Sequence, residues 1–209
     1  MIKRIIFDFD DTLVPFRDYY YKQLFDFYNC YLPGTNKQEA FLGLMNYMES
    51  NIKYYTKEEL IKIMEEYLNT KLPNDFWDTF VSLMINMVEQ RDSDVKDILE
   101  YLSSKYELVI LTNWIKEVQV GKLKKLGLYR YFKEVYACDT FLVKPSLESF
   151  EIAKGKYKYN ECAMVGDSFK IDIEIPNKLG MKTYFITNED IFIKNNICIK
   201  SLDELKELL

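Results

Sequence analysis

The sequence predicts an α/β protein, in which a doubly wound parallel sheet carries an inserted all-helical segment near its start. Short, continuous apolar runs are typical of strands buried on both faces of a parallel sheet, and they occur at residues 5–7, 108–111, 135–138, 162–165 and 183–186. From residue 92 onward, these runs alternate with segments of helical periodicity. Such alternation predicts right-handed βαβ crossovers, helices on both faces of the sheet, and a ligand site at the carboxyl ends of the strands.

The first apolar run is followed by a stretch with several helical patterns and no convincing strand. It extends over residues 16–90, and Thr56 with Glu59 forms a candidate capping box at the start of one helix. The many aromatic side chains of this stretch are interpreted as packing residues rather than as a surface on which a substrate stacks. We therefore predict a core of residues 1–15 and 91–209, interrupted by a helical insertion of residues 16–90.

The core helices are predicted from apolar residues that share one helical face. Val95 and Leu102 mark such a face after Ser93, which is a candidate N-terminal cap. A second face begins after Ser146 and extends to Tyr157. Each of these helices precedes a predicted strand, as the crossovers of a parallel sheet require.

Composition and charge exclude several classes of protein. Of the 209 residues, 48% are hydrophobic and 29% are charged, which is typical of an ordinary globular protein rather than of a disordered chain. The formal net charge of -5 disfavours a nucleic-acid partner. No apolar run reaches the roughly 18 residues of a membrane span, and charges interrupt residues 1–13, so no signal peptide is indicated. We expect a cytoplasmic protein without membrane contact.

The sequence contains no histidine, which excludes Ser-His-Asp triads and histidine-ligated zinc. The four cysteines, Cys30, Cys138, Cys162 and Cys198, show no C-x-x-C spacing, and we interpret them as small buried apolar residues. The chemistry is therefore expected to use carboxylates, hydroxyls, lysines or a hard metal ion.

Two aspartates follow the first predicted strand, with one residue between them. Side chains two positions apart in extended chain face the same side, so Asp8 and Asp10 can direct both carboxylates at one point. Two carboxylates held this close repel one another unless a cation lies between them or they differ in protonation. The pair indicates a metal or acid-base site, although a solvated acidic turn has the same pattern.

Candidate phosphate-binding groups follow two further strands. Thr112 and Asn113 end the second apolar run, where a hydroxyl, an amide and backbone N–H groups can hold phosphate oxygens. Lys144, which precedes Pro145 and the N-terminus of a predicted helix, can neutralise phosphate charge. Taken alone, each of these is more often an ordinary turn or a solvated surface lysine.

The fourth apolar run ends in another polar segment. Gly166 allows a tight turn there, and Asp167 and Asp172 follow it. With Asp8 and the Asp10 carbonyl, these side chains can complete a set of oxygen ligands for Mg²⁺. Four such segments in this order, each at the carboxyl end of a predicted parallel strand, indicate a single site.

Together these segments resemble the four motifs of the haloacid dehalogenase superfamily of phosphatases. The matching residues are Asp8-Phe9-Asp10-Asp11-Thr12, Thr112-Asn113, Lys144-Pro145 and Gly166-Asp167-Ser168 with Asp172. The match covers essentially the whole core, and the helical insertion after the first motif resembles the helical cap of that superfamily. The resemblance implies a Rossmann-like core and an enzyme that hydrolyses phosphoric monoesters with Mg²⁺.

The resemblance also implies roles for individual residues. Asp8 would be the nucleophile that forms an aspartyl-phosphate, and Asp10 would be the general acid and base. Thr112, Asn113 and Lys144 would bind the transferring phosphoryl group.

The metal ligands implied by the resemblance are Asp8, the Asp10 carbonyl and Asp167, while Asp172 would bind directly or through water. The chain departs from the pattern at residues 173–176, because relatives tend to have small residues where this chain has Ile-Glu-Ile-Pro. This departure leaves the geometry of the helix after Asp172 open.

Other branches of the superfamily are alternatives. Dehalogenases lack a carboxylate at the position of Asp10, so its presence favours phosphate chemistry. A phosphonate-cleaving branch uses a cap lysine as a Schiff-base nucleophile, and Lys22, Lys37 and Lys53 lie in the insertion, although nothing marks one of them as buried. A phosphomutase needs the same core and remains an alternative.

Outside the superfamily, a receiver-like phospho-acceptor signalling module also gathers aspartates, a hydroxyl and a lysine around Mg²⁺. Receivers accept phosphate on a central strand rather than on the first strand, and they lack an inserted cap. A non-catalytic interaction protein is disfavoured by the intact carboxylates and lysine. We expect the partner to be a small phosphorylated metabolite or a mononucleotide, and the oligomeric state does not follow from the sequence.

Overall fold

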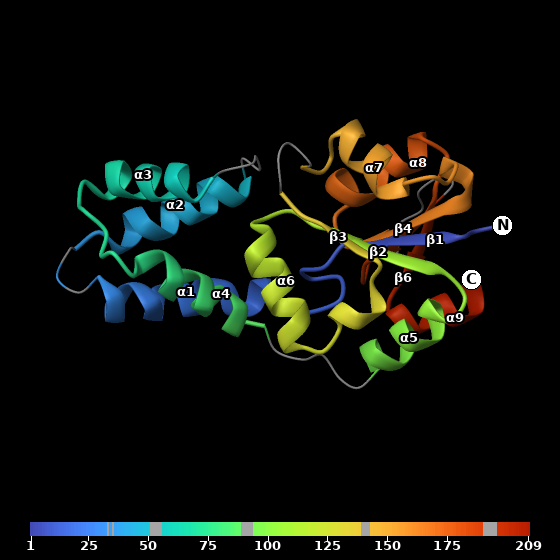
Figure 1. Cartoon of the computed structure of the whole chain (residues 1–209), viewed down its shortest axis with the longest axis horizontal. Coiled ribbons are helices and arrows are strands. Elements are labelled where there is room, and N and C mark those ends of the chain that lie inside the picture. The colour runs from blue at the N-terminus through green and yellow to red at the C-terminus, as the bar shows by residue number, and fades with distance from the viewer. Residues whose placement is uncertain (33, 35, 51–55, 89–93, 139–142, 190–195) are drawn as a thin grey trace.

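A computed structural model describes residues 1–32, 34, 36–50, 56–88, 94–138, 143–189 and 196–209. Figure 1 shows an α/β core, which contains both ends of the chain, and a body of helices formed by residues between 17 and 86. None of the helices described is both long and apolar enough to cross a lipid bilayer. The arrangement matches the predicted sheet with a helical insertion near its start.

The strands of the described core are β1 (Arg4–Phe7), β2 (Glu107–Leu111), β3 (Glu134–Tyr136), β4 (Cys162–Gly166), β5 (Lys182–Ile186) and β6 (Asn196–Ile199). They form one parallel sheet in the order β3-β2-β1-β4-β5-β6. The chain thus extends the sheet first to one side of β1 and then to the other. This is the order of a Rossmann-like, doubly wound sheet, and it places the ligand crevice at the carboxyl end of β1. The predicted fold class is confirmed.

The five strands predicted from apolar runs are all present, because their residues are largely enclosed by the layers on either side. All four residues of β1, for example, are buried. The third strand is shorter than its apolar run and ends at Tyr136, so Cys138 lies in the loop beyond it. The sixth strand escapes prediction because it forms an edge of the sheet, where three of its four residues are only half-buried.

Helices cover both faces of the sheet, as βα alternation requires. On one face, α5 (Asp94–Ser103), α6 (Lys116–Lys125) and α9 (Leu205–Leu208) contribute to the buried cluster that contains Ile5 and Phe7. On the other face, α7 (Leu147–Lys154) and α8 (Glu174–Lys178) pack around Ile6. Successive residues of β1 therefore point into opposite layers. Short 3₁₀ turns lie at Tyr129–Tyr131, Tyr159–Glu161 and Leu202–Glu204.

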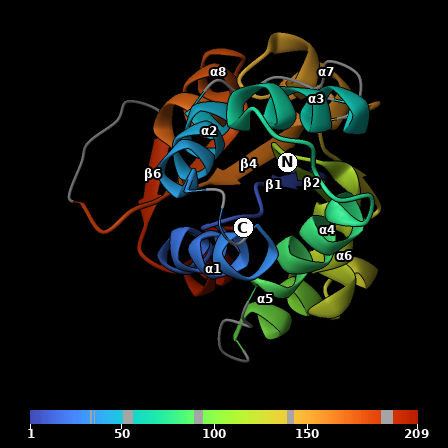
Figure 2. The same ribbon diagram turned by 90° about the vertical axis from the view of Figure 1, so that its left-hand side faces the viewer.

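The helices of the insertion pack around a hydrophobic cluster of their own, and Figure 2 looks onto this helical body. They are α1 (Arg17–Tyr31), α2 (Gln38–Ser50), α3 (Lys57–Leu68) and α4 (Phe76–Asn86). On α1, Tyr20, Phe27 and Tyr28 are buried in the cluster, whereas Tyr21 and Phe25 each expose 44% of their surface. The interpretation as packing residues is confirmed for the buried rings.

Side-chain caps fix the starts of two predicted helices. The hydroxyl of Thr56 accepts a hydrogen bond from the Glu59 backbone N–H (3.1 Å), and the Glu59 carboxylate accepts one from the Thr56 N–H (2.8 Å). The predicted capping box is therefore confirmed. Ser146 likewise caps α7 by accepting from the Ser149 N–H. Ser93, the candidate cap of α5, lies outside the described residues, as does Lys53 of the insertion.

Two expectations need correction. The helix after Ser146 ends at Lys154 and does not reach Tyr157, because Gly155, with a φ of 59° and a ψ of -133°, takes a non-helical conformation that favours glycine. The prediction that all four cysteines are buried is correct for Cys138 and Cys162 only, because Cys30 is exposed on α1 and Cys198 is half-buried. An amphipathic helix has a solvent-facing side, and the spacing of cysteines alone does not reveal which side each one occupies.

Candidate active site

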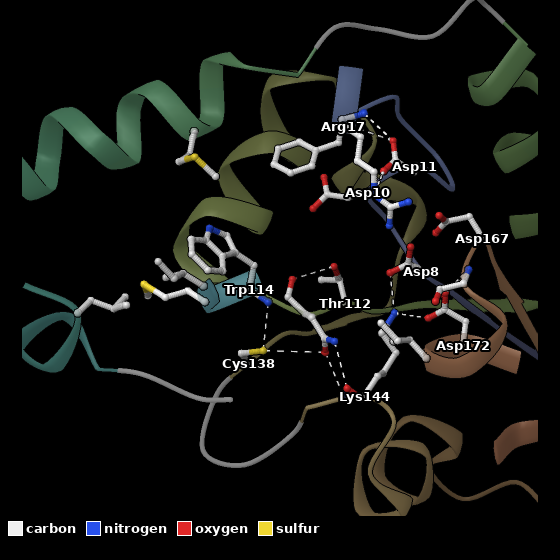
Figure 3. A pocket seen from close by; sticks show the side chains of 18 residues that line it. Asp8, Asp10, Asp11, Arg17, Thr112, Trp114, Cys138, Lys144, Asp167 and Asp172 are labelled. Atoms are coloured by element: carbon white, nitrogen blue, oxygen red, sulfur yellow. Dashed lines mark hydrogen bonds and ion pairs between the residues drawn. The ribbon is translucent and has the colours of Figure 1, made fainter. Parts of the chain in front are cut away.

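A cavity of about 200 Å³ opens where the carboxyl ends of the central strands meet the helical body (Figure 3). Its polar wall comes from the core and includes Asp8, Asp10, Thr112, Asn113, Lys144, Asp167 and Asp172. Its apolar wall comes from the helical body and the loop after β2, and includes Phe16, Met48, Leu60, Met84, Trp114 and Ile115. The structure thus brings together all four polar segments that the sequence predicts.

Asp8 directly follows β1, and its backbone N–H donates to the Val165 carbonyl of β4 (2.9 Å). The side chain is buried, with one carboxylate oxygen 2.6 Å from Lys144 Nζ. Burial raises the pKa of the Asp8 carboxyl group to about 8, and the charges of Asp172 and Asp167 act in the same direction. The ionised form therefore needs more positive charge than this one lysine supplies.

Lys144 bridges two carboxylates at the centre of the polar wall. Its Nζ lies 2.6 Å from both Asp8 Oδ1 and Asp172 Oδ1. Asn113 fixes the lysine backbone, since its Oδ1 accepts from the Lys144 N–H (2.9 Å) and its Nδ2 donates to the Lys144 carbonyl (3.2 Å). Burial alone would lower the pKa of Lys144, but the two carboxylates outweigh it and raise the pKa above its ordinary value. The ammonium group therefore stays charged.

Asp172 lies in the π-helical turn Phe169–Ile173, which follows β4 and precedes the short α8. Its Oδ2 accepts a hydrogen bond from the Ser168 backbone N–H (3.0 Å). Asp172 thus lies within an irregular helical turn, and residues 173–176, where the chain departs from the family pattern, lead from this turn into the α-helical α8. The carboxylate itself remains in position beside Lys144.

Gly166 was expected to allow a tight turn, but the structure shows that it leaves room for a neighbouring side chain. A Cβ atom at this position would lie 2.4 Å from the Cβ of Asp172, so only glycine lets the Asp172 side chain lie against the end of β4. Asp167, the next residue, completes the acidic segment, and burial raises the pKa of its carboxyl group to about 6.

The donor set of this site suits a hard divalent cation. Asp8, Asp167 and Asp172 each offer a carboxylate oxygen, and these three oxygens lie within 4.8 Å of one another. The Lys144 ammonium group pairs with Asp8 and Asp172, and Asp167 has no ion pair with it, so the ionised carboxylates of the cluster outnumber the lysine. Mg²⁺ prefers oxygen ligands and would balance this charge. The predicted metal residues therefore converge, and the role of the Asp10 carbonyl stays a prediction.

The carboxylate of Asp10 contacts α6 rather than the acidic cluster. Lys122 Nζ lies 2.9 Å and 3.2 Å from its two oxygens, and Gln119 Nε2 donates to Oδ2 at 2.8 Å. No motif points to Gln119 or Lys122. A signal was nevertheless available for the lysine, because Lys122 lies on the same helical face as the buried residues Val118 and Leu126. A lysine on an apolar face needs a partner, and here the partner is Asp10.

Thr112 and Asn113 lie at the end of β2, as predicted, but their side chains have different partners. The Thr112 backbone N–H donates to the Tyr136 carbonyl (2.9 Å), and its buried hydroxyl accepts from Gln119 Nε2 (2.8 Å). The Asn113 amide is occupied by the backbone of Lys144. Phosphate binding by both residues stays a prediction.

Two residues beside the cavity have positive φ angles, namely Asp11 (61°) and Trp114 (94°). Asp11 Oδ1 accepts from the backbone N–H groups of Phe16 (2.9 Å) and Arg17 (3.2 Å), and so caps the start of α1. The backbone N–H of Trp114 donates to Cys138 Sγ at 3.1 Å. Both conformations are rare for residues other than glycine, and both occur where the core meets the helical body.

Known proteins resemble this chain in sequence and in fold. Residues 5–186 match the family model of the haloacid dehalogenase-like hydrolases. Over its whole length the chain is 26% identical to a protein of Methanocaldococcus jannaschii named glyceraldehyde 3-phosphate phosphatase, and the match covers 97% of that protein. Two solved structures have the same fold.

The first of these structures is a phosphatase from Thermococcus onnurineus, with a TM-score of 0.72 and 21% identity over 99% of this chain and 97% of that one. The second is YfnB from Bacillus subtilis bound to magnesium, with a TM-score of 0.71 and 21% identity over 99% of this chain and 98% of that one. At such identities, the likeness establishes the fold alone.

Proposed function

Because this chain belongs to the haloacid dehalogenase-like hydrolase family, we propose that it hydrolyses a small phosphate monoester. The observation that carries the proposal is the convergence of Asp8, Asp167, Asp172 and Lys144 in one cavity. The constellation supplies a nucleophile, a cation for phosphoryl oxygens and metal ligands in one place. Asp10, on the same wall, adds a proton donor and acceptor.

In the first half-reaction, a carboxylate oxygen of Asp8 attacks the phosphorus atom while the bond from phosphorus to the leaving oxygen breaks. Protonated Asp10 gives its proton to that oxygen, which departs as an alcohol. Lys144 and Thr112 bind the phosphoryl oxygens. The Lys144 ammonium, 2.6 Å from the nucleophile, offsets the repulsion between a carboxylate and an anionic phosphate.

In the second half-reaction, ionised Asp10 takes a proton from water, and the water oxygen attacks the phosphorus of the aspartyl-phosphate. The bond between phosphorus and Asp8 then breaks, which frees the carboxylate and inorganic phosphate. Asp10 thus acts first as an acid and then as a base, while Asp8 alone carries the covalent intermediate.

Mg²⁺ is the proposed cofactor. Asp8 and Asp167 would hold it together with the Asp10 carbonyl, and Asp172 would do so directly or through water. When bound, the ion supplies positive charge that stabilises the transferring phosphoryl group. The magnesium bound to YfnB, which shares this fold, supports the assignment.

Residues 16–90 are proposed to act as a cap that selects the leaving group, with the chemistry carried by residues 1–15 and 91–209.

The cavity of about 200 Å³ is smaller than the roughly 300 Å³ at which pockets for drug-sized ligands begin. A small phosphorylated metabolite is therefore favoured over a mononucleotide. The name of the Methanocaldococcus jannaschii relative makes glyceraldehyde 3-phosphate the first compound to test. A cytoplasmic location, without nucleic-acid or membrane partners, completes the proposal.

The proposal is tested with p-nitrophenyl phosphate and Mg²⁺, with and without a chelator. Asp8→Asn and Asp10→Asn should each lower turnover at least ~1000-fold, because each removes a member of a unit that acts together. Asp97→Asn, which changes an exposed carboxylate on α5, is the matched control and should keep full activity. Near-normal turnover by either active-site variant contradicts the assigned roles.

The products distinguish the alternative functions. A phosphatase releases inorganic phosphate from each phosphorylated metabolite it accepts, whereas a phosphomutase returns an isomeric phosphate ester. A receiver-like module would become phosphorylated once and show no steady turnover.

A further inference from the structure

Two polar side chains of α6 are fully buried beside the cavity, yet they form no part of its wall. Lys122 and Gln119 each have 0% exposure, and neither is among the residues that line the cavity. Both converge on Asp10: Lys122 Nζ contacts its two oxygens at 2.9 and 3.2 Å, and Gln119 Nε2 contacts one of them at 2.8 Å. Three contacts from two side chains of α6 leave the carboxylate few other orientations.

Gln119 also ties Asp10 to the end of β2. Its Nε2 lies 2.8 Å from the Thr112 hydroxyl and 3.0 Å from the Asn113 carbonyl. Thr112 is the proposed phosphate ligand, and Asp10 is the proposed acid and base. A single buried amide therefore helps to set the position of the proton-transfer group relative to the phosphoryl group.

Lys122 is held from its other side by aromatic rings. Its Nζ lies 3.9 Å from the ring centroid of Phe16 and 5.9 Å from that of Phe9. Phe16 immediately precedes α1 and belongs to the buried cluster of the helical body. The lysine is thus fixed between Asp10 and the start of the helical body.

We infer that Lys122 and Gln119 are positioning residues, which hold the Asp10 carboxylate in line for proton transfer during the proposed phosphatase reaction. They are not catalytic, since neither reaches the cavity. Stability gives a weak reason for their presence, because burying an ammonium group is costly and apolar side chains often replace a buried ion pair without loss. Orientation of an acid that must serve two half-reactions gives a stronger one.

Lys122→Met and Gln119→Met test the inference with p-nitrophenyl phosphate and Mg²⁺ under stopped flow. Steady turnover should fall about 100-fold, the usual effect of misplacing a reacting group by ~1 Å. The burst of p-nitrophenolate from the first turnover should remain, because this stable anion leaves without a proton, whereas the water attack still needs Asp10. Lys124→Met, an exposed lysine of the same helix, is the control and should keep the parent rate. A parent-like rate in both active-site variants overturns the inference.

A double-mutant cycle separates action through Asp10 from a general structural role. In an Asp10→Asn background, Lys122→Met should lower turnover by less than about two-fold, because effects that act through a shared partner do not add. A loss as large as in the parent background overturns the inference. If Lys122→Met does not fold, as judged by thermal melting, Gln119→Met decides, because it removes no charge.

Crystal structures of the two single variants give a readout that does not depend on activity. The Asp10 carboxylate should leave its parent position in both. If it stays in place in both, the inference is wrong even if the chain proves to have another activity. A parent protein without phosphatase turnover, in contrast, overturns the proposed function and leaves this structural comparison to decide the inference.

Discussion

Gly166 lies against the side chain of Asp172, and the substitution Gly166→Ala tests how closely the site is packed. The new Cβ would meet Asp172 Cβ at 2.4 Å and Cγ at 2.6 Å, so the carboxylate must move away from Lys144. We expect a stability loss of about 1–3 kcal/mol, as for other overpacked sites. Turnover of p-nitrophenyl phosphate should fall about 100-fold, because Asp172, the partner of Lys144 and a proposed metal ligand, is displaced.

The matched control for this substitution is Gly43→Ala on α2. A Cβ at Gly43 meets no atom within 4 Å, and the residue lies inside a helix. It should raise stability by roughly 0.5–1 kcal/mol through helix propensity and leave turnover unchanged. Parent-like turnover by Gly166→Ala would show that Asp172 can occupy its position with less room than the structure indicates.

Single residues also show which parts of the site can be predicted from sequence. Asp8 was predictable because it directly follows a buried strand, and Lys144 because it precedes a helix within a short motif. A parallel sheet brings the ends of its strands together, so both side chains reach one cavity. Gln119 and Lys122 belong to no motif. They reach Asp10 from the buried face of a helix, and their contact across more than a hundred residues exists only once α6 has packed.

At the scale of elements, the joint between core and helical body is the contact of α6 with α4. Gly121 of α6 faces Ile85 of α4 so closely that an added Cβ would lie 2.3 Å from Ile85 Cδ1. Gly121→Val should therefore destabilise the protein by about 1–3 kcal/mol. Thermal or denaturant unfolding measures the loss.

A second substitution shows whether the loss arises at this joint. Ile85→Ala removes the atoms that the new side chain would meet, so the double variant should be more stable than the sum of the two single effects predicts. If the stability losses of the two single variants simply add in the double variant, the two helices do not approach one another at these residues. Because α6 also holds Asp10, a loosened joint should lower turnover as well as stability.

Elements differ in how well the sequence predicts them, and burial explains the difference. All four residues of β1, a strand enclosed on both faces, are buried, whereas three of the four residues of β6, at the sheet edge, are only half-buried. Helix starts with a side-chain cap, as at Thr56, were predictable from short motifs. The end of α7 at Lys154 depends on the positive φ of Gly155, which apolar periodicity does not reveal.

At the scale of the whole molecule, folding brings carboxylates from distant parts of the chain to one point, and this should make stability depend on pH. The pKa of Asp8 is raised by burial to about 8, whereas a carboxyl group of this kind in the unfolded chain titrates near ~4. Between these values the folded state binds more protons than the unfolded state. The free energy of unfolding therefore falls as pH rises through this range and is highest in its lower part.

The range from pH 6 to pH 8 isolates this effect, because Asp167, with a pKa raised by burial to about 6, contributes mainly below it. Glutamates outside the site, such as Glu65, whose pKa is lowered by Lys71, are ionised throughout this range and contribute no slope. In a chelator, the melting temperature should fall from pH 6 to pH 8, and Asp8→Asn should remove most of the fall. Mg²⁺ should reverse it, since a cation bound to the three carboxylates favours their ionised forms in the folded state only. A melting temperature that stays constant over this range in chelator would mean that Asp8 is already ionised beside Lys144, and that the site reaches charge balance without a divalent ion.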